Sequence, residues 1–173
     1  MPAAPLAVIL TGPATPCRVG EPVAISVEVR NVSDRPLRMV GVLDGSEAGF
    51  RFPRYRPEIT GPSAGAETDS VFWCGTVAPL HLRDVRLLMP GEGFDPRMAA
   101  DGSAFFPLAA FLGFRPTAPG GYRFRLIVDT SAPAADEWLG MPSILNEEEI
   151  RRLLDEVPRG EYVSNTLDIE VLP

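Results

Sequence analysis

The sequence predicts an all-β fold, an antiparallel β-sandwich of about seven short strands, on two observations. Nineteen prolines and sixteen glycines divide the 173 residues into short runs, and turn pairs such as Gly12-Pro13, Gly61-Pro62 and Pro90-Gly91 separate these runs. Within the runs, apolar and polar side chains alternate, as in strands that have one buried and one solvated face. A parallel sheet would need repeated helices between its strands, and one helix pattern stands out.

The predicted strands differ in how regular their alternation is. In the four clearest segments the apolar side chains fall on every second residue, so they share one face of a strand. These segments are residues 23–29, 85–89, 122–128 and 167–171. Less regular alternation predicts three more strands at residues 6–10, 37–43 and 104–111.

The helix is predicted shortly before the last strand. Asn146 and Glu149 have the spacing of a capping box, in which two side chains satisfy free backbone N–H groups at a helix start. Pro158 and Gly160 are expected to end the helix. Between them runs an apolar stripe at helical spacing, formed by Ile150, Leu153, Leu154 and Val157.

A minimal sandwich needs only ~100 residues. We therefore predict one domain over residues 1–173, with insertions at about residues 44–84 and 130–164. The first insertion is rich in proline, glycine and arginine, and the second carries the helix. Long connections inside a domain usually have a function or their own structure.

Three segments resemble bacterial immunoglobulin-like domains. Residues 19–37 (VGEPVAISVEVRNVSDRPL) are similar to their second and third strands, residues 118–126 (APGGYRFRL) to the entry of their sixth strand, and residues 88–93 (LMPGEG) to a turn. The resemblance implies an immunoglobulin-like sandwich in which Tyr122 forms a tyrosine corner after Pro119 and Gly120. Phe124 stands where antibody domains have a cysteine, so their inter-sheet disulfide is not implied. No activity is implied either.

Composition excludes several classes of function. The chain has 23 acidic residues against 16 basic ones, a formal net charge of −7, which makes nucleic acid a poor default partner. There is no lysine, which excludes Schiff-base catalysis, a Walker-type phosphate lysine and a Ser-Lys nucleophile. His81 is the single histidine, so a multi-histidine metal site is excluded. We expect no enzyme activity, no cofactor and no metal.

The cellular context is also an expectation from sequence. Lysine and glutamine are both missing, which indicates a GC-rich and bacterial genome. Residues 6–10 form the longest apolar run, which is too short to span a membrane. The first residues lack the basic start and apolar stretch of a signal peptide. We therefore expect a cytoplasmic protein.

Several candidate sites each have two interpretations. Cys17 and Cys74 are interpreted as free thiols, with a disulfide or redox chemistry as alternatives. His81 with Asp84 and a serine would suit a hydrolase, but the sequence has no Gly-x-Ser-x-Gly elbow, and a surface histidine is the simpler interpretation. Asn31-Val32-Ser33 matches a glycosylation sequon and is interpreted as a turn.

Calcium binding is a further alternative at two Asp-Gly-Ser sequences, residues 44–46 and 101–103. Asp-Gly is first a turn signal, so turns are predicted at both places. A calcium site at a loop end would use one or more of Asp129, Asp136 and Glu137.

Two surfaces are candidates for binding another protein. Arginines alternate with aromatic residues in the segment that contains Arg51, Arg54, Tyr55 and Arg56. Such a segment suits a protein interface or single-stranded nucleic acid, or is ordinary surface.

The second candidate follows from charge asymmetry. Residues 1–128 carry 12 acids and 13 arginines, a net of +1, whereas residues 129–173 carry 11 acids and 3 arginines, a net of −8. The acids are predicted to form a docking face for a basic partner or, alternatively, a solubilising helix face. The aromatic residue nearby either anchors a partner or pins the insertion to the sandwich. The predicted face consists of Trp138, Glu147, Glu148, Asp155 and Glu156.

The sequence thus favours a non-enzymatic module that binds a protein, or has a structural role, and presents an acidic helical insertion. An alternative is an accessory carbohydrate- or ligand-binding domain that uses exposed aromatic residues, namely Trp73, Trp138 and Tyr55. A hydrolase that uses His81 is a third alternative. Another protein is the expected partner, and pairing between copies is left open.

Overall fold

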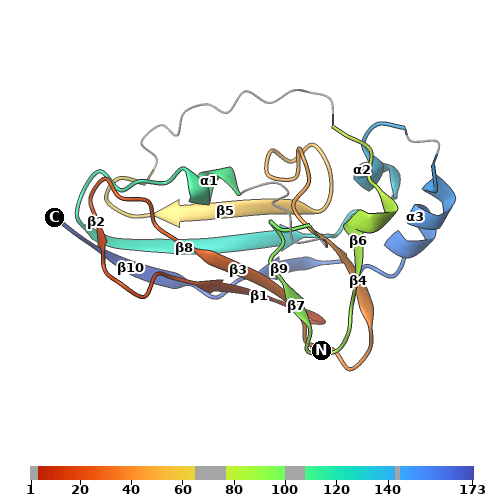
Figure 1. Ribbon diagram of the computed structural model, residues 1–173, viewed down its shortest axis with the longest axis horizontal. Coiled ribbons are helices and arrows are strands. Elements are labelled where there is room, and N and C mark those ends of the chain that lie inside the picture. Colours follow the sequence, from red (N-terminus) through yellow and green to blue (C-terminus); the bar gives the residue numbers. More distant parts are fainter. Residues whose placement is uncertain (1–3, 65–76, 100–107, 143–144) are drawn as a thin grey trace.

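The computed structural model describes residues 4–64, 77–99, 108–142 and 145–173 (Figure 1). Within them the chain is mostly β, with mainly antiparallel strand pairs and three short α-helices, so the expected β class is confirmed. Ten strands are present in the described part, and some of them have only two or three residues.

One sheet has the strand order β1-β3-β7. The central strand β3 (Ser26–Asn31) pairs antiparallel with β1 (Leu6–Thr11) on one side and with β7 (Gly93–Phe94) on the other. Alternate residues of β1 and β3 are buried, as the sequence pattern predicts.

A second sheet is built around the long strand β8 (Gly120–Asp129). On one side β8 pairs with β5 (Arg54–Thr60), and on the other with β10 (Leu167–Leu172) and then β9 (Glu161–Val163). Strand β2 (Cys17–Arg18) adds to β10 in parallel. In Figure 1, β5 and β8 run above β1 and β3, and one apolar core joins the two sheets.

Two smaller strands continue the fold at one end. Strand β4 (Leu37–Val40) pairs antiparallel with β6 (Val85–Leu88), which follows the short 3-10 helix η1 (Leu82–Asp84). This pair is joined to β3 by Asn31, which is fully buried. The Asn31 amide donates to the Leu88 carbonyl at 3.0 Å and to the Arg35 carbonyl at 2.9 Å.

The other end of the Asn31 side chain forms the predicted turn. Its Oδ1 accepts from the Ser33 backbone N–H at 2.9 Å and from the Ser33 hydroxyl at 2.7 Å. The turn interpretation of residues 31–33 is therefore confirmed, and both the Oδ1 and the Nδ2 of the Asn31 side chain are engaged inside the protein.

Tyr122 makes the hydrogen bond expected of a tyrosine corner. Its hydroxyl donates to the Ala118 carbonyl at 2.8 Å, four residues upstream. Because that uses its one hydrogen, the Ser63 hydroxyl donates to Tyr122 at 2.5 Å. Gly61 passes over the Tyr122 ring with φ of +153°, and a Cβ there would lie 2.5 Å from Cδ1 of the ring, so a glycine is required.

The strand predicted at residues 104–111 is wrong where the structure describes it. Helix α1 (Ala109–Leu112) lies there, and residues 104–107 are outside the described part. The Glu47 carboxylate accepts from the N–H groups of Ala109 at 2.7 Å and Ala110 at 2.9 Å. A distant acid therefore caps the helix, which strand periodicity cannot reveal.

The predicted insertion at residues 44–84 contains β5, a strand that was not predicted from the sequence. Charged residues and Pro57 obscure the strand pattern there. Pro57 fits because β5 ends the hydrogen-bonded order of its sheet, and the opposite residue, Leu126, turns its N–H and carbonyl away toward Ser164.

Substitution of Asn31 tests the junction between β3 and the β4–β6 pair. Asn31→Ala is expected to lower the free energy of unfolding by ~3 kcal/mol, because several buried groups lose their partners. Ser33→Ala removes one of these bonds and is expected to cost about 1 kcal/mol or less. Urea denaturation measures both, and equal losses would contradict the central role of Asn31.

Candidate functional site

Helices α2 (Asp136–Leu139) and α3 (Glu147–Leu154) lie at one end of the molecule, beside β6 (Figure 1). The predicted apolar stripe of α3 is confirmed, since Ile150, Leu153 and Leu154 are buried. The predicted capping box is wrong, because Asn146 has a left-handed backbone with φ of 60° and makes no side-chain cap bond. Packing therefore holds α3 in place.

Trp138 lies in α2 with 0% of its surface exposed, so its role as an anchor for a partner is wrong. Its indole N–H donates to the Ala132 carbonyl at 3.2 Å, and its ring lies 6.0 Å from that of Phe52. The Arg159 guanidinium covers the ring at 4.7 Å. The alternative interpretation, that Trp138 pins the insertion to the rest of the fold, describes these contacts.

Arg51 fastens three segments together and is only 2% exposed. Its guanidinium donates to the Trp138 carbonyl at 3.1 Å, to the Ala78 carbonyl at 2.6 Å and to Asp44 at 3.0 Å. We call these four residues the Arg51 clamp. Burial lowers the pKa of Arg51, and the charge of Asp44 opposes this shift. Arg51 is thus a structural residue, and its predicted role in a surface patch is wrong.

Gly140 lets the chain approach the Arg51 clamp closely. Its φ of +71° favours glycine, and a Cβ would meet the Ala78 carbonyl oxygen. Asp44 accepts from the backbone N–H of Ala78 at 2.5 Å in addition to Arg51. Asp44 therefore belongs to the clamp and not to a calcium site.

The remaining residues of the arginine patch do not form one surface. Tyr55 is fully buried and donates its hydroxyl to the Val40 carbonyl at 2.7 Å, so its predicted contact with a partner is wrong. Arg54 lies 4.2 Å from the centre of the Phe52 ring. Arg56 is exposed and pairs with Glu161 at 2.5 Å.

The predicted acids on α3 and just after it do reach the surface. Glu148, Asp155 and Glu156 are exposed, and Glu147 is half-buried. Glu147 pairs with Arg151 at 2.8 Å, and Glu156 pairs with Arg38 of β4 at 3.2 Å. No ion pair is found for Glu148 or Asp155 within the described residues. The charge of Asp155 acts on the nearby Arg159 guanidinium, so Glu148 is the acid of the two that is open to a cation from outside.

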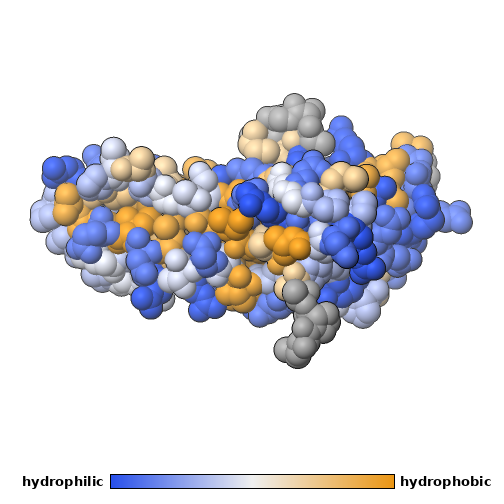
Figure 2. Space-filling view, turned by 90° about the horizontal axis from the view of Figure 1, so that it is seen from below, coloured by the Kyte–Doolittle hydropathy of each residue, from blue (hydrophilic) through white to orange (hydrophobic). Residues whose placement is uncertain are grey.

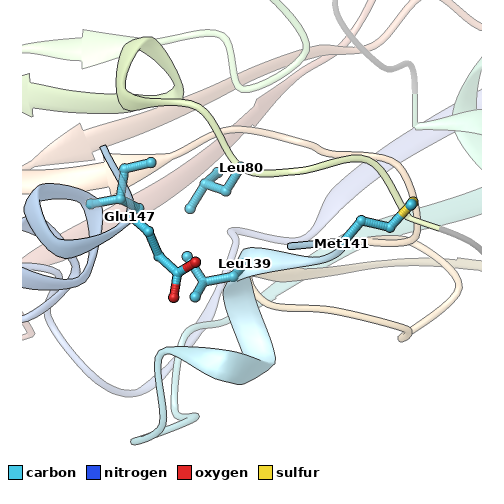
Figure 3. Close-up of a pocket in the computed structure, with 5 residues that line it drawn as sticks. Leu80, Leu139, Met141 and Glu147 are labelled. Atoms are coloured by element: carbon cyan, nitrogen blue, oxygen red, sulfur yellow. The ribbon is translucent and has the colours of Figure 1, made fainter. Parts of the chain in front are cut away.

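A small crevice lies under the start of α3 (Figure 3). Leu80 and Leu139 border the crevice, and the Glu147 side chain runs down beside them, with its carboxylate next to Leu139 in this view. The cavity volume is about 10 Å³, room for roughly one water molecule. It is a packing gap and not a substrate pocket.

The acids of the catalytic and metal alternatives make other contacts where the structure describes them. Asp84 accepts from the backbone N–H of the exposed residue His81 at 2.8 Å, so its carboxylate is engaged by the main chain. Among the described residues, no group of three or more His, Cys, Asp or Glu side chains lies close enough to hold a metal ion. Asp129 accepts from the Ser131 N–H, and Asp136 pairs with Arg151. Residues 101–103 lie outside the described part.

Cys17 is buried and carries a free thiol. Burial raises the pKa of this thiol, and the charge of Glu21 raises it further. A neutral buried thiol is a poor nucleophile, which fits a packing role. Cys74 and Trp73 lie outside the described residues.

Comparisons with protein families, with curated proteins and with solved structures found no match. In the part of the chain that the structure describes, no helix has the length and apolar character needed to cross a bilayer.

Sequence reasoning missed the Arg51 clamp. Its members are far apart in the chain, and only Gly140 between apolar residues hinted at a close approach. From sequence alone, an arginine among aromatic residues is predicted to be exposed, because the carbonyl groups that could accept its hydrogen bonds in the interior are not known.

Substitution of Arg51 tests the clamp. Arg51→Lys is expected to lower the free energy of unfolding by ~3 kcal/mol, because a lysine cannot supply the forked donors and leaves buried carbonyls unpaired. Arg56→Lys is the matched control on the surface, with an expected change within about 0.5 kcal/mol. Equal effects in urea denaturation would contradict a special role for Arg51.

The alkaline side of the stability profile tests the burial of Tyr55. Burial raises the pKa of the Tyr55 hydroxyl far above its ordinary value near 10. The unfolded chain therefore loses this proton above pH ~10 while the folded chain keeps it, so stability is full below that pH and falls as pH rises.

Because the chain has no lysine, few other groups titrate in this range. Tyr55→Phe is expected to reduce the slope of unfolding free energy against pH by up to about 1.4 kcal/mol per pH unit above pH ~10. Urea denaturation across this range measures it. An unchanged slope would show that Tyr55 ionises in the folded state.

Proposed function

We propose that this chain is a non-enzymatic protein-binding module that presents an acidic face to a basic partner. The acidic face consists of Glu147, Glu148, Asp155 and Glu156. The observation that carries the proposal is a firmly packed helix whose acids reach the surface, where Glu148 and Asp155 make no ion pair within the described residues. Loops and helices held on a rigid scaffold are where such domains recognise partners.

Rigidity supports this proposal. The Arg51 clamp and the buried Trp138 ring hold α2, and the apolar stripe holds α3. A pre-ordered face loses little conformational entropy on binding. Figure 2 shows that the end of the molecule near α3 is mainly hydrophilic in that view, while apolar residues gather toward the opposite end.

The scaffold is proposed to be an immunoglobulin-like sandwich. The antiparallel pairing of β8 with β10, the parallel addition of β2 to β10 and the hydrogen bond from Tyr122 to Ala118 support this. The segments between β8 and β10 would then be the insertion, with α2, α3 and β9 inside it.

The carbohydrate-binding alternative depends on exposed aromatic residues. Two of the three aromatic residues that it needs, Tyr55 and Trp138, are buried, and Trp73 lies outside the described part. No observation among the described residues favours it over protein binding.

Charge-matched variants test the acidic face. One variant carries Glu148→Gln, Asp155→Asn and Glu156→Gln. Its control carries Glu58→Gln, Asp168→Asn and Glu170→Gln, which are exposed acids on β5 and β10. Both variants lose three negative charges, so a general charge effect alters them equally.

The intact chain and both variants serve as bait for native bacterial lysate, and captured proteins are identified and then titrated singly. A basic partner is expected to bind the intact chain and the control, and to bind the acidic-face variant at least tenfold more weakly, in a salt-dependent manner. Equal binding by both variants would contradict the acidic face as the recognition surface. Circular dichroism confirms that the variants are folded.

A further inference from the structure

A second binding surface lies away from α3, beside the extended segment that leads into β3. Its residues, 22–26, alternate between exposed and buried like a strand, and the sequence predicts a strand from residue 23. Yet the hydrogen-bonded strand begins only at Ser26, because β1 pairs no further than the Thr11–Ser26 position. The strand pattern in the sequence therefore begins three residues before the hydrogen-bonded strand does.

The direction of the backbone groups follows from β3. Asn31 donates its backbone N–H to the Glu92 carbonyl and accepts from Gly91, both on the β7 side. Every second residue turns the same way in a strand, so Ile25 and Val23 face that side too. The Ile25 carbonyl accepts from the Arg97 guanidinium at 3.0 Å there.

The N–H groups of Val23 and Ile25 have no hydrogen-bond acceptor within the described residues. Two residues of extended chain separate them by ~7 Å, the repeat that carbonyl groups have along a neighbouring strand. These two N–H groups are therefore spaced to donate to the carbonyl groups of a neighbouring strand.

An open groove runs along this edge, with a volume of about 320 Å³. Phe111 and Leu112 of α1 form its apolar wall, and Leu112 is 66% exposed. Arg97 also lines the groove, fixed by Asp95 at 2.7 Å. The groove thus combines backbone donors on one side with an apolar surface on the other.

Two other sheet edges, those of β1 and β5, are protected. On β1, the Asn165 side chain accepts from the Leu10 N–H at 2.7 Å and donates to the Leu10 carbonyl at 3.0 Å. On β5, Pro57 removes a donor, and the Tyr55 N–H donates to the Ser46 carbonyl at 3.1 Å. Such protection is how soluble proteins prevent strand addition, and no comparable contact is found at residues 22–26 in the part of the chain that the structure describes.

We propose that this groove binds an extended segment of a partner protein, which adds as a strand along residues 22–26 and places an apolar side chain against Phe111 and Leu112. A row of peptide carbonyls satisfies the two N–H groups. A purely apolar ligand would leave them buried without partners, which is unfavourable. The site does not involve α3, so a test of this proposal is independent of a test of the acidic face.

The probe is a neutral peptide, acetyl-Ser-Val-Thr-Val-Thr-Val-Ser-amide, added to the full-length ¹⁵N-labelled chain. Saturable chemical-shift changes are expected at the amides of Val23 and Ile25, with hydrogen exchange there slowed at least tenfold. The absence of changes at these amides up to about 5 mM peptide would overturn the proposal.

Two modified peptides test whether the contact is a strand pairing. One carries N-methyl groups on its valines and the other on its threonines, so each blocks one edge of the extended peptide. One of the two is expected to bind at least tenfold more weakly than the other. Equal affinities would overturn strand addition, because a contact through side chains alone does not distinguish the edges.

A substitution in the apolar wall of the groove tests where the peptide binds. Leu112→Glu is expected to weaken the peptide at least tenfold, since it puts a charge where an apolar side chain packs. Leu87→Glu is the matched control, because Leu87 is also exposed, at 45%, and does not line the groove. If both variants bind like the unmodified chain, the groove is not the binding site.

Discussion

The arrangement of the α2–α3 end depends on how one buried cation is accommodated. Removing a guanidinium from water is costly unless its donors find acceptors. Arg51 finds them on Asp44 and on carbonyls of two distant segments, so the burial of this one guanidinium links three segments. The Trp138 carbonyl is among these acceptors, which ties α2 to the clamp. The exposed acids on α3 therefore lie beside a part of the fold that the Arg51 clamp holds in place.

Polar side chains also bond to strand backbones elsewhere, some of them between sheets and one within a sheet. Asn165 gives Leu10 the donor and acceptor that a neighbouring strand would give. Ser164 next to it accepts from the Leu126 N–H at 2.9 Å. Asn31 links β3 to the end of β6. These links allow short strands to form a stable whole, since strands of this length pair weakly alone.

What the sequence predicts well here is burial. The periodicities of β1, β3, β8, β10 and α3 appear as buried faces, because apolar spacing depends directly on which side meets the core. The failures concern long-range polar contacts. The Glu47 carboxylate caps a helix near residue 110 where a strand was predicted. Trp138 and Arg51 were assigned to surfaces because the residues that they contact are distant in the chain. Composition located the acidic face correctly at the surface, since charge seeks water.

The difference between burial and pairing is itself informative at residues 22–26. Alternation of buried and exposed side chains shows only that one face of the segment meets the core. The hydrogen-bond ladder shows whether a neighbouring strand satisfies the backbone N–H and carbonyl groups. In a completed sheet the two coincide, as they do along β8. Here the alternation extends past the ladder while the backbone donors face a groove with an apolar wall. A segment that alternates like a strand but has no ladder partner within the described residues is best explained by a neighbour that arrives from another chain.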